Sequence, residues 1–461
     1  MQDLPSIAPV APGSPVDLRP YQADAIRRAR GEMRAGRKRV VIVLPTGAGK
    51  TRLASAIVYS AIGKGSTVLW LAHRTELVDQ ACRTLGSFGL PFGVVAATSE
   101  HRPDPEAPVQ VASIQTLVAR ETHRPPANLI VWDEAHHASE AASTWSGLLD
   151  AYPDVPMIGL TATPERGDGA GLAPLFNGIV VGASVAQLTA LGHLVPCEIV
   201  RPARMLEPGQ IAQDPIAAYR DHGGGRQALL FARSVEEAQR YADELTASGT
   251  RAECVHASTP AATRKLALDC YRAGSVRVLT CVYVFTEGTD LPMAAVCILA
   301  RGAGSPGIYL QMAGRVLRPA PGKTSALLID LRGVSHVHGC PDDDRLYSLE
   351  GRGISLAQTR HCQVCSAILE SGYPCPACDY APTQADAAET VVTGDPLVKF
   401  ARKRAENADE RHATLLRWVR AALEKGHRPA SVRFKWRAVY DEDLPMRTLM
   451  LAVQEVRNAQ A

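Results

Sequence analysis

A glycine-containing loop near the N-terminus constrains the fold of this chain more than any other feature. The loop reads PTGAGKT over residues 45–51; the apolar run Val40–Leu44 precedes it, and an apolar helical segment, Leu53–Ala61, follows it. A strand, a glycine loop and a helix in this order form a local structure that binds phosphate groups. The sequence therefore predicts an α/β sheet with an anion site at the carboxyl end of a strand.

The residue types in this loop predict a nucleotide site. Glycines let backbone N–H groups turn toward phosphate oxygens, a lysine neutralises the β and γ oxygens, and the following hydroxyl ligates Mg²⁺. Lys50 and Thr51 are expected to take the last two roles. The loop residues expected to bind the nucleotide are Thr46, Gly47, Ala48, Gly49, Lys50 and Thr51.

Two adjacent carboxylates form a second candidate feature. The apolar run Leu129–Trp132 leads directly into Asp133 and Glu134. A strand that ends in carboxylates carries them at the same edge of a parallel sheet as the phosphate loop. We expect Asp133 to hold Mg²⁺ through water, and Glu134 to orient and deprotonate an attacking water. Without a phosphate loop, such a pair is more typical of a solvated strand end.

Short apolar runs alternate with helical segments over two stretches of the chain. The runs are Val40–Leu44, Thr67–Ala72, Val109–Ala112, Leu129–Trp132 and Met157–Thr161, then Ala228–Ala232, Arg251–Val255, Val276–Cys281, Ala295–Ala300 and Ser325–Asp330. Continuous apolar runs are typical of strands buried on both faces of a parallel sheet. We therefore expect two tandem α/β domains, residues 17–194 and 195–340, after a flexible leader of residues 1–16. No strands are expected beyond Gly339.

The motifs and their order resemble a superfamily 2 helicase with a DEAH signature. The resemblance is to the branch that contains phage helicases, XPB-like proteins and restriction-enzyme motors. It is carried by residues 18–22 (LRPYQ), 45–51 (PTGAGKT), 71–80 (LAHRTELVDQ), 112–117 (ASIQTL), 133–136 (DEAH), 160–164 (LTATP), 229–234 (LLFARS), 287–292 (EGTDLP) and 311–318 (QMAGRVLR). It covers residues 18 to about 335 and implies two RecA-like domains that close on ATP.

The resemblance also implies roles for single residues. Gln22 is expected to contact adenine, Gly288 and Asp290 to bind nucleotide, and Gln311, Arg315 and Arg318 to act in catalysis. The two arginines are spaced one helical turn apart, so they are expected to face the same way. As arginine fingers they would stabilise the γ-phosphate only when the second domain closes on the first.

Two positions depart from the usual patterns: Leu44 stands where the general phosphate loop has glycine, and Thr289 where close relatives commonly carry an aromatic residue.

A pair of cysteine knuckles follows the second domain. Cys362 and Cys365 form one C-x₂-C pair, and Cys375 and Cys378 form the other. The segment is too short to bury an apolar core, and four thiolates in tetrahedral coordination of Zn²⁺ would fold it. We therefore expect a small, structural, zinc-ribbon-like module over residues 355–382. Four unligated buried thiols are the alternative.

The C-terminal region, residues 397–461, is expected to be helical and basic. From Lys399 to Arg437 it has 12 basic and 4 acidic residues, an excess of eight positive charges. Trp418, Phe434 and Trp436 are interleaved, which suits phosphate contact and base stacking. The alternative is an amphipathic helix pair that turns Leu415, Leu416, Val419 and Leu423 inward and leaves a solvated basic face.

Composition limits the compartment and the partners. The chain has 461 residues, 50 basic and 47 acidic, and the net charge of +3 excludes a chain that is basic throughout. No stretch approaches the roughly 18 consecutive apolar residues of a membrane span. The odd number of cysteines, 11, and the lack of a targeting leader favour a reducing compartment. We expect a cytoplasmic protein of a bacterial or phage-infected cell, without a membrane partner.

The sequence favours an ATP-dependent DNA helicase or translocase. ATP, Mg²⁺ and Zn²⁺ are the expected cofactors, and single-stranded, duplex or forked DNA is the expected partner. The preference for DNA depends on the resemblance of residues 18–22 and 287–290 to the DNA-acting branch. Two alternatives stay open. One is an RNA helicase, and the other is an ATP-gated DNA-binding or remodelling subunit of a larger complex.

Overall fold

The computed structural model describes residues 16–350 with gaps, residues 390–400, and scattered residues between 360 and 456; the gaps are 74, 98, 100, 120–123, 140–149, 166–170, 208, 283, 285–289 and 346. Gly288 and the predicted zinc ligands Cys362, Cys365, Cys375 and Cys378 lie outside the described residues. The chain divides into two compact units, Met1–Gly353 with Gln384–Lys399, and Ile354–Thr383 with Phe400–Ala461.

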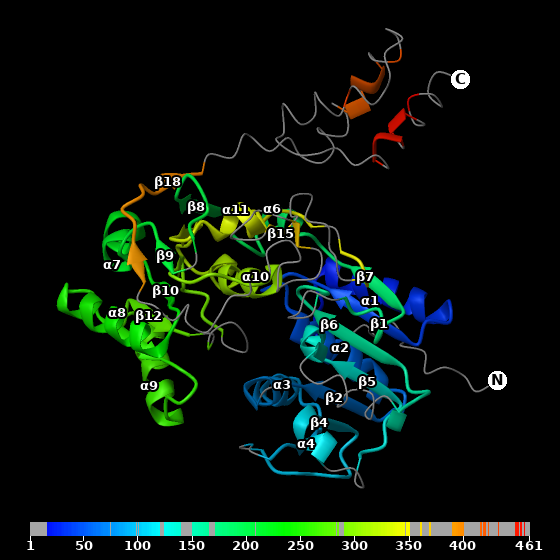
Figure 1. Ribbon diagram of the computed structural model, residues 1–461. Coiled ribbons are helices and arrows are strands. Elements are labelled where there is room, and N and C mark those ends of the chain that lie inside the picture. The colour runs from blue at the N-terminus through cyan, green and yellow to red at the C-terminus, as the bar shows by residue number, and fades with distance from the viewer. Residues whose placement is uncertain are drawn as a thin grey trace. The chain divides into compact units, whose positions relative to one another are not determined.

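The first lobe is built on a seven-stranded parallel sheet with the order β3-β4-β2-β5-β6-β1-β7. Its strands are β1 (Arg39–Val43), β2 (Val68–Ala72), β3 (Gly93–Val95), β4 (Val109–Ser113), β5 (Leu129–Trp132), β6 (Met157–Thr161) and β7 (Gly178–Val181). Its helices are α1 (Pro20–Arg34), α2 (Lys50–Ile62), α3 (Thr75–Ser87), α4 (Ile114–Ala119), η1 (Ala135–Ser139) and α6 (Val185–Ala190), drawn mostly in blue to cyan in Figure 1.

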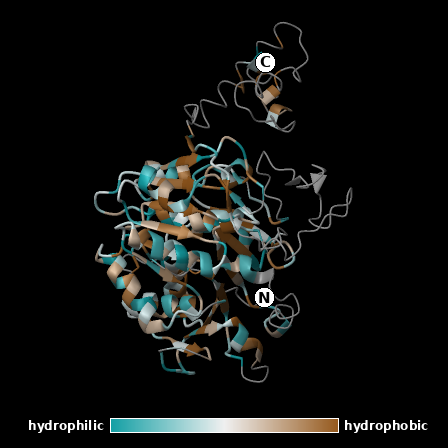
Figure 2. Ribbon diagram, turned by 60° about the vertical axis from the view of Figure 1, so that its left-hand side comes forward, coloured by the Kyte–Doolittle hydropathy of each residue, from teal (hydrophilic) through white to brown (hydrophobic). Residues whose placement is uncertain are grey.

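Burial of the strands explains why they form. Every residue of β2, β5 and β6 is buried, and the apolar strands stand out in brown in Figure 2. Trp132 and Phe176 pack in the same core cluster, with ring centroids 6.0 Å apart. β1 pairs with β6 so that Val43 lies opposite Thr161. The loops that follow parallel strands therefore share one edge of the sheet.

The second lobe repeats this architecture, with the sheet order β11-β12-β10-β13-β14-β8-β18. Its strands are β8 (Cys197–Arg201), β10 (Ala228–Phe231), β11 (Ala252–Val255), β12 (Val278–Cys281), β13 (Val296–Leu299) and β14 (Ala326–Asp330), with β9 (Gln210–Ile211) outside the sheet. Its helices are α7 (Pro215–Ala218), η2 (Tyr219–Gly223), α8 (Val235–Ala247), α9 (Ala261–Arg272), α10 (Pro306–Gly314), η3 (Arg315–Leu317) and α11 (Val334–His338). The predicted pair of parallel-sheet domains is confirmed.

The expectation of no strands beyond Gly339 is wrong. β18 (Val398–Lys399) adds to the second sheet, antiparallel to β8, and β17 (Val391–Val392) pairs with β9. Lys399 Nζ also lies 2.6 Å from Glu198 Oε2. Two-residue strands carry no periodic signal, and their pairing depends on the open edges of β8 and β9 rather than on their own sequence.

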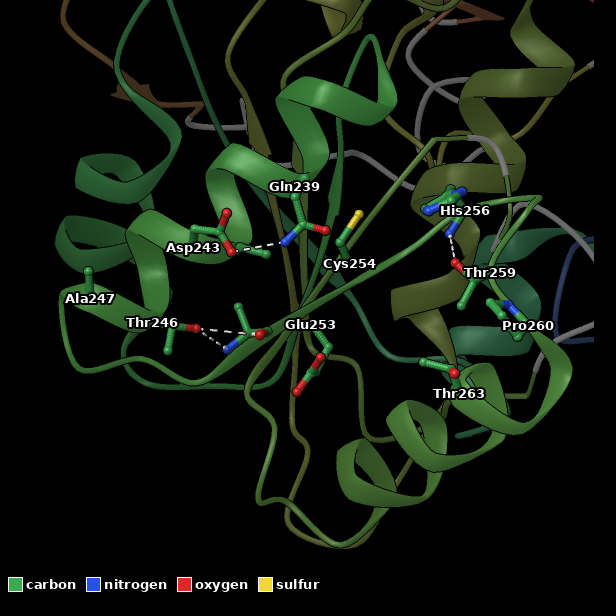
Figure 3. A pocket seen from close by; sticks show the side chains of 12 residues that line it. Gln239, Asp243, Thr246, Ala247, Glu253, Cys254, His256, Thr259, Pro260 and Thr263 are labelled. Atoms are coloured by element: carbon green, nitrogen blue, oxygen red, sulfur yellow. Dashed lines mark hydrogen bonds between the residues drawn. The ribbon is translucent and has the colours of Figure 1, made fainter.

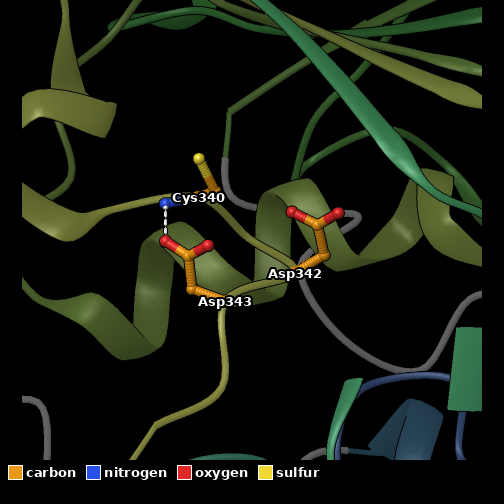
Figure 4. A group of neighbouring side chains, drawn as sticks. All are labelled: Cys340, Asp342 and Asp343. Atoms are coloured by element: carbon orange, nitrogen blue, oxygen red, sulfur yellow. Dashed lines mark hydrogen bonds between the residues drawn. The ribbon is translucent and has the colours of Figure 1, made fainter. Parts of the chain in front are cut away.

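A strap formed by residues 339–345 and 347–350 runs from the second lobe back to the first. At its start Asp343 Oδ2 accepts a hydrogen bond from the backbone N–H of Cys340 at 2.6 Å (Figure 4), and Asp342 Oδ2 accepts one from the N–H of Cys197 at 3.3 Å. At its end the carbonyl of Leu349 accepts a hydrogen bond from the N–H of Ala173 at 2.8 Å, and Leu349 packs against the first core. The strap is thus a second connection between the lobes, in addition to the linker between β7 and β8.

The second unit contains its own apolar cluster. Its buried members are Leu415, Val419, Val432, Leu449, Ala452, Val453 and Val456, and Leu416, Trp418 and Leu423 pack against them. This packing agrees with the alternative interpretation of the region, in which Leu415, Leu416, Val419 and Leu423 face inward. Trp418 contributes to this packing. The unit also contains β15 (Arg360–His361) and β16 (Ile368–Leu369), which pair antiparallel. None of the helices in the described part of the chain is long and apolar enough to cross a membrane.

Candidate nucleotide site

The phosphate loop joins β1 to α2 in a conformation that depends on two glycines. Gly47 has φ +87° and Gly49 has φ +78°, and Gly49 is the N-cap of the 13-residue helix α2. The loop thus ends at a helix N-terminus, where free N–H groups and the helix dipole favour an anion. Lys50, the first residue of α2, is buried and brings its ammonium group to this anion site. The backbone and the lysine fit a phosphate chain.

Gln22 and Tyr21, at the start of α1, support the loop from outside. Gln22 Nε2 donates hydrogen bonds to the carbonyls of Ala48 at 3.0 Å and Gly49 at 3.2 Å, and the Tyr21 hydroxyl donates to Ala48 at 2.9 Å. A Cβ added to Gly49 would lie 2.6 Å from Gln22 Nε2. Gln22 therefore positions the loop, a role that the sequence did not indicate. Its expected contact with adenine stays a prediction.

The two carboxylates follow β5 at the same sheet edge. Asp133 is buried, and its Oδ1 accepts a hydrogen bond from the N–H of Glu134 at 3.1 Å. Glu134 has φ +50°, the only positive φ of a non-glycine residue in the described part of the chain. Its Oε1 lies 3.5 Å from Lys50 Nζ. Strained backbone of this kind is concentrated at functional sites, and here it directs the carboxylate toward the phosphate loop.

The donor chemistry of this edge suits Mg²⁺. Thr51 is the second residue of α2 and offers a hydroxyl, and Asp133 offers a carboxylate. Hydroxyl, carboxylate and water oxygens are the ligands that this ion prefers beside phosphates. These two residues would hold the ion, as the sequence predicts.

The second lobe contacts the phosphate loop through the segment that contains Arg315 and Arg318. A Cβ at Gly47 would lie 3.2 Å from Arg318 Cγ and 3.7 Å from Arg318 Nε, and a Cβ at Gly314 would lie 2.9 Å from Thr46 Cβ. Arg318 Nε is buried and has no hydrogen-bond partner among the described residues. The Arg318 guanidinium also forms an ion pair with Asp290, which is 72% exposed. An arginine of the second lobe thus lies over the anion site of the first.

The expected single α-helical turn between the two arginines is wrong. α10 ends at Gly314, Arg315 begins the 3₁₀ turn η3, and Arg318 is extended, with φ −67° and ψ 136°. Arg315 is buried. A 3₁₀ turn has three residues per turn, so it advances the chain faster than an α-helix would. The arginines therefore take different backbone conformations, and Arg318 contacts the phosphate loop.

Lys323 fixes the backbone behind Arg318. Its Nζ donates hydrogen bonds to the carbonyls of Arg318 at 2.6 Å, Ala294 at 2.6 Å and Pro292 at 3.0 Å. Burial, together with the positive charge of Arg318, lowers the pKa of Lys323 to about 8. Sequence reasoning missed this residue, because its three acceptors are backbone groups and leave no pattern of side chains.

A buried hydrogen bond joins the two lobes beside the carboxylates. Gln311 Nε2 donates to His136 Nε2 at 2.8 Å, and His136 Nδ1 lies 3.1 Å from Thr161 Oγ1 and 3.4 Å from Glu134 Oε2. His136 therefore connects Gln311 of the second lobe to the candidate general base. Gln311 was expected at the site; the role of His136 was missed, although it belongs to the DEAH segment.

A separate pocket of about 720 Å³ lies on the second lobe (Figure 3). It lies against β11 and the helices α8 and α9, and its charged lining residues are the acidic Asp243 and Glu253. No lysine or arginine lines it, and it shares no residue with the phosphate loop. It is not suited to hold a nucleotide.

Comparison with known proteins agrees with this arrangement. Residues 15–166 match the family model described as type III restriction enzyme, res subunit, and residues 213–320 match the helicase conserved C-terminal domain. The chain is 32% identical over 355 residues to a 51.5 kDa protein of a Lactococcus phage, an alignment that covers 71% of this chain and 75% of the phage protein.

Other relatives carry helicase or translocase names. The putative ATP-dependent helicase IRC3 of Saccharomyces cerevisiae is 28% identical, with 69% of this chain and 52% of that protein covered. The DNA 3'-5' translocase XPB2 of Sulfurisphaera tokodaii is 26% identical, with coverages of 68% and 81%. The chain thus spans about half the length of IRC3 and most of the length of XPB2.

Solved structures share the fold at low sequence identity. A fragment of a putative HsdR subunit of a type I restriction enzyme from Vibrio vulnificus has a TM-score of 0.54 at 21% identity, covering 72% of this chain and 67% of that one. The type ISP restriction-modification enzyme LlaBIII, solved bound to DNA, has a TM-score of 0.53 at 17% identity, with coverages of 68% and 27%.

Proposed function

Because the chain belongs to the superfamily 2 helicases that join a type III restriction res-subunit domain to a helicase C-terminal domain, we propose that it is an ATP-dependent DNA helicase or translocase. The observation that carries this proposal is the position of Arg318 over Gly47. One lobe offers the phosphate cradle and the other offers the cation, so the active centre is complete only when both lobes meet. The names of the relatives support DNA as the nucleic acid on which the chain acts.

The residues of this chain suggest how ATP would be hydrolysed. The loop N–H groups and Lys50 bind the phosphates, and Glu134 takes a proton from the water that attacks the γ-phosphorus. The bond between the γ-phosphorus and the β–γ bridging oxygen breaks, so that ADP leaves. Arg318 and Arg315 stabilise the charge on the transferring group from the second lobe. Mg²⁺ held by Thr51 and Asp133 would neutralise charge on the β and γ oxygens. Release of the γ-phosphate removes the group that the arginines hold, so the lobes are free to separate.

The test is ATPase activity of the full chain with single-stranded, duplex and forked DNA and with RNA of equal length. We expect stimulation by DNA. Stimulation by RNA alone would contradict the choice of DNA, and an absence of ATPase activity with every nucleic acid would contradict the enzyme assignment. A strand-displacement assay on the same samples separates unwinding from translocation.

We further propose that Cys362, Cys365, Cys375 and Cys378 bind one structural Zn²⁺, and that this module and the basic region of residues 397–461 grip DNA. The spacing of the knuckles and the excess of eight positive charges between Lys399 and Arg437 support this. Replacing Cys362 and Cys375 by serine should release the zinc and weaken DNA binding while basal ATPase persists. Elemental analysis that finds no zinc in the wild-type protein would rule out the metal.

A further inference from the structure

Three histidine rings and a glutamine form a continuous row in the first lobe. Gln115 Nε2 donates to His73 Nδ1 at 3.1 Å. The rings of His73 and His137 stack, with centroids 4.8 Å apart and planes 11° from parallel. The rings of His137 and His136 are 4.3 Å apart with an interplanar angle of 36°. Each side chain in the row therefore contacts the next.

The strand order explains why residues so distant in sequence meet. Gln115 follows β4, His73 follows β2, and His136 and His137 follow β5. β4, β2 and β5 are consecutive in the sheet, and all three are parallel. The row therefore crosses the carboxyl edge of the sheet one strand at a time, from an exposed residue to a buried one. Gln115 is exposed, whereas His137 is only 9% exposed.

The buried end of the row is the contact between the lobes. The side-chain nitrogen of Gln311 can only donate, so His136 Nε2 accepts, and the ring proton of His136 is on Nδ1. That N–H faces Thr161 Oγ1 and Glu134 Oε2. One orientation of the His136 ring thus accepts the Gln311 hydrogen bond on one side and, on the other, bonds Thr161 Oγ1 and places Nδ1 3.4 Å from Glu134 Oε2, an atom without a hydrogen-bond partner among the described residues. A rotation of the ring would break both contacts.

We propose that His73 and His137 are positioning residues that hold the His136 ring in the orientation that links Gln311 to Glu134. This inference rests on the proposed ATPase function. Rings in van der Waals contact exclude one another, so His137 restricts the side-chain torsions of His136. His73 restricts His137 in turn, and the Gln115 hydrogen bond fixes His73. The orientation of the candidate base is thereby tied to the outer edge of the sheet.

The first experiment tests the stacking. His137→Ala should lower kcat for ATP about tenfold with and without DNA, and should leave KM for ATP within about twofold. His137→Phe keeps an aromatic ring at the same place and should retain most of the wild-type kcat. His222→Ala, in η2 of the second lobe, is the matched histidine control and should behave as wild type. Thermal unfolding of each variant shows whether it is folded.

The second experiment tests transmission along the row. The row connects His73 to Gln311 through His137 and His136, and His73 and Gln311 lie on either side of these two rings. The effects of substituting these two residues should be additive unless the row acts as a unit. We expect Gln311→Ala to lower kcat about tenfold in the otherwise wild-type protein. In a protein that already carries His73→Ala, the same substitution should lower kcat only about threefold. In a protein that carries His222→Ala instead, Gln311→Ala should still lower kcat by the full factor of about ten. His73 is less buried than His137. The double-mutant cycle of His73→Ala and Gln311→Ala can therefore be measured even if His137→Ala does not fold.

Several outcomes would overturn the inference. Wild-type kcat in folded His137→Ala, a His137→Phe variant as slow as the alanine variant, or additive effects of His73→Ala and Gln311→Ala would each do so. These outcomes differ from failure of the proposed function, in which the wild-type protein itself does not hydrolyse ATP. Because kcat is measured with and without DNA, the row is tested even if DNA does not stimulate the enzyme.

Discussion

The phosphate loop of the first lobe and the arginine segment of the second lobe hold their polar groups by different means. The loop relies on backbone, because Gly47 and Gly49 take positive φ and Gln22 bonds to the loop carbonyls. The arginine segment relies on side chains, with Arg318 paired to exposed Asp290. A backbone cradle stays formed without a ligand, whereas a partly exposed ion pair is readily exchanged for another anion.

This difference divides the two lobes between binding and turnover. We expect the first lobe to bind phosphate by itself, since its loop, lysine and helix N-terminus are all local in sequence. The second lobe adds charge stabilisation only where its arginines reach the bound phosphate. Substitutions in the first lobe should therefore affect nucleotide binding, and substitutions in the second should affect turnover.

The largest effect is expected for Lys50→Ala. Its ammonium group is the buried cation of the first half of the site, 3.5 Å from Glu134 Oε1. Its loss leaves the β and γ oxygens without their counter-charge and removes the ion pair of Glu134 Oε1. Both nucleotide binding, measured by fluorescence of a labelled ATP analogue, and turnover should fall below detection. Near-normal ATPase would contradict the assignment of the loop. Lys64→Ala, two residues beyond the C-terminal end of α2, is the control.

Arg318→Ala should separate binding from turnover. We expect kcat to fall about 10³-fold, as for other arginine fingers, while the nucleotide Kd changes by less than about tenfold. Asp290→Ala removes the ion-pair partner of Arg318, together with the nucleotide contact expected of Asp290, and should have a much smaller effect on kcat. If Arg318→Ala instead abolished nucleotide binding and spared kcat, the proposed division between the lobes would be wrong.

The parts of the fold that follow from local pattern were predictable. Strands such as β5 and β6 are continuous apolar runs, and their bounds agree with the sequence. β3 and β7 were missed because each begins with a glycine and is short, Gly93–Val95 and Gly178–Val181. β18 was missed because two residues take their strand geometry from the edge of β8 rather than from their own propensity.

The candidate site divides in the same way. Its loop and its pair of carboxylates are each contiguous in sequence and each follow an apolar run, so local pattern predicted them as candidates. The His136–Gln311 contact joins residues 175 positions apart, and no local pattern encodes such a pairing. Gln22 was located by resemblance, but its bonds to the loop carbonyls became evident only from the folded chain.

A smaller effect is expected for Gln22→Ala. This change removes two hydrogen bonds to the loop carbonyls and opens the space beside Gly49. Each lost bond contributes about 1 kcal/mol, so we expect KM for ATP to rise roughly tenfold with kcat changed less. Tyr21→Phe removes one bond to the same carbonyl of Ala48 and should give a smaller rise. Equal KM values for all three proteins would contradict the bracing role.

The smallest effect is expected from the pH dependence of Lys323. The pKa of Lys323 is about 8 in the folded protein, whereas the ordinary pKa of a lysine is 10.5. Between these values the unfolded chain holds a proton that the folded chain has lost, so the free energy of unfolding rises with pH from about 8 to 10.5. The Lys323→Met variant has no ammonium group at this position, so its free energy of unfolding should not show this increase with pH. Urea unfolding of both proteins from pH 7.5 to 10 measures it. Parallel pH profiles would mean that the three carbonyls bound by the Lys323 ammonium offset the cost of burying its charge.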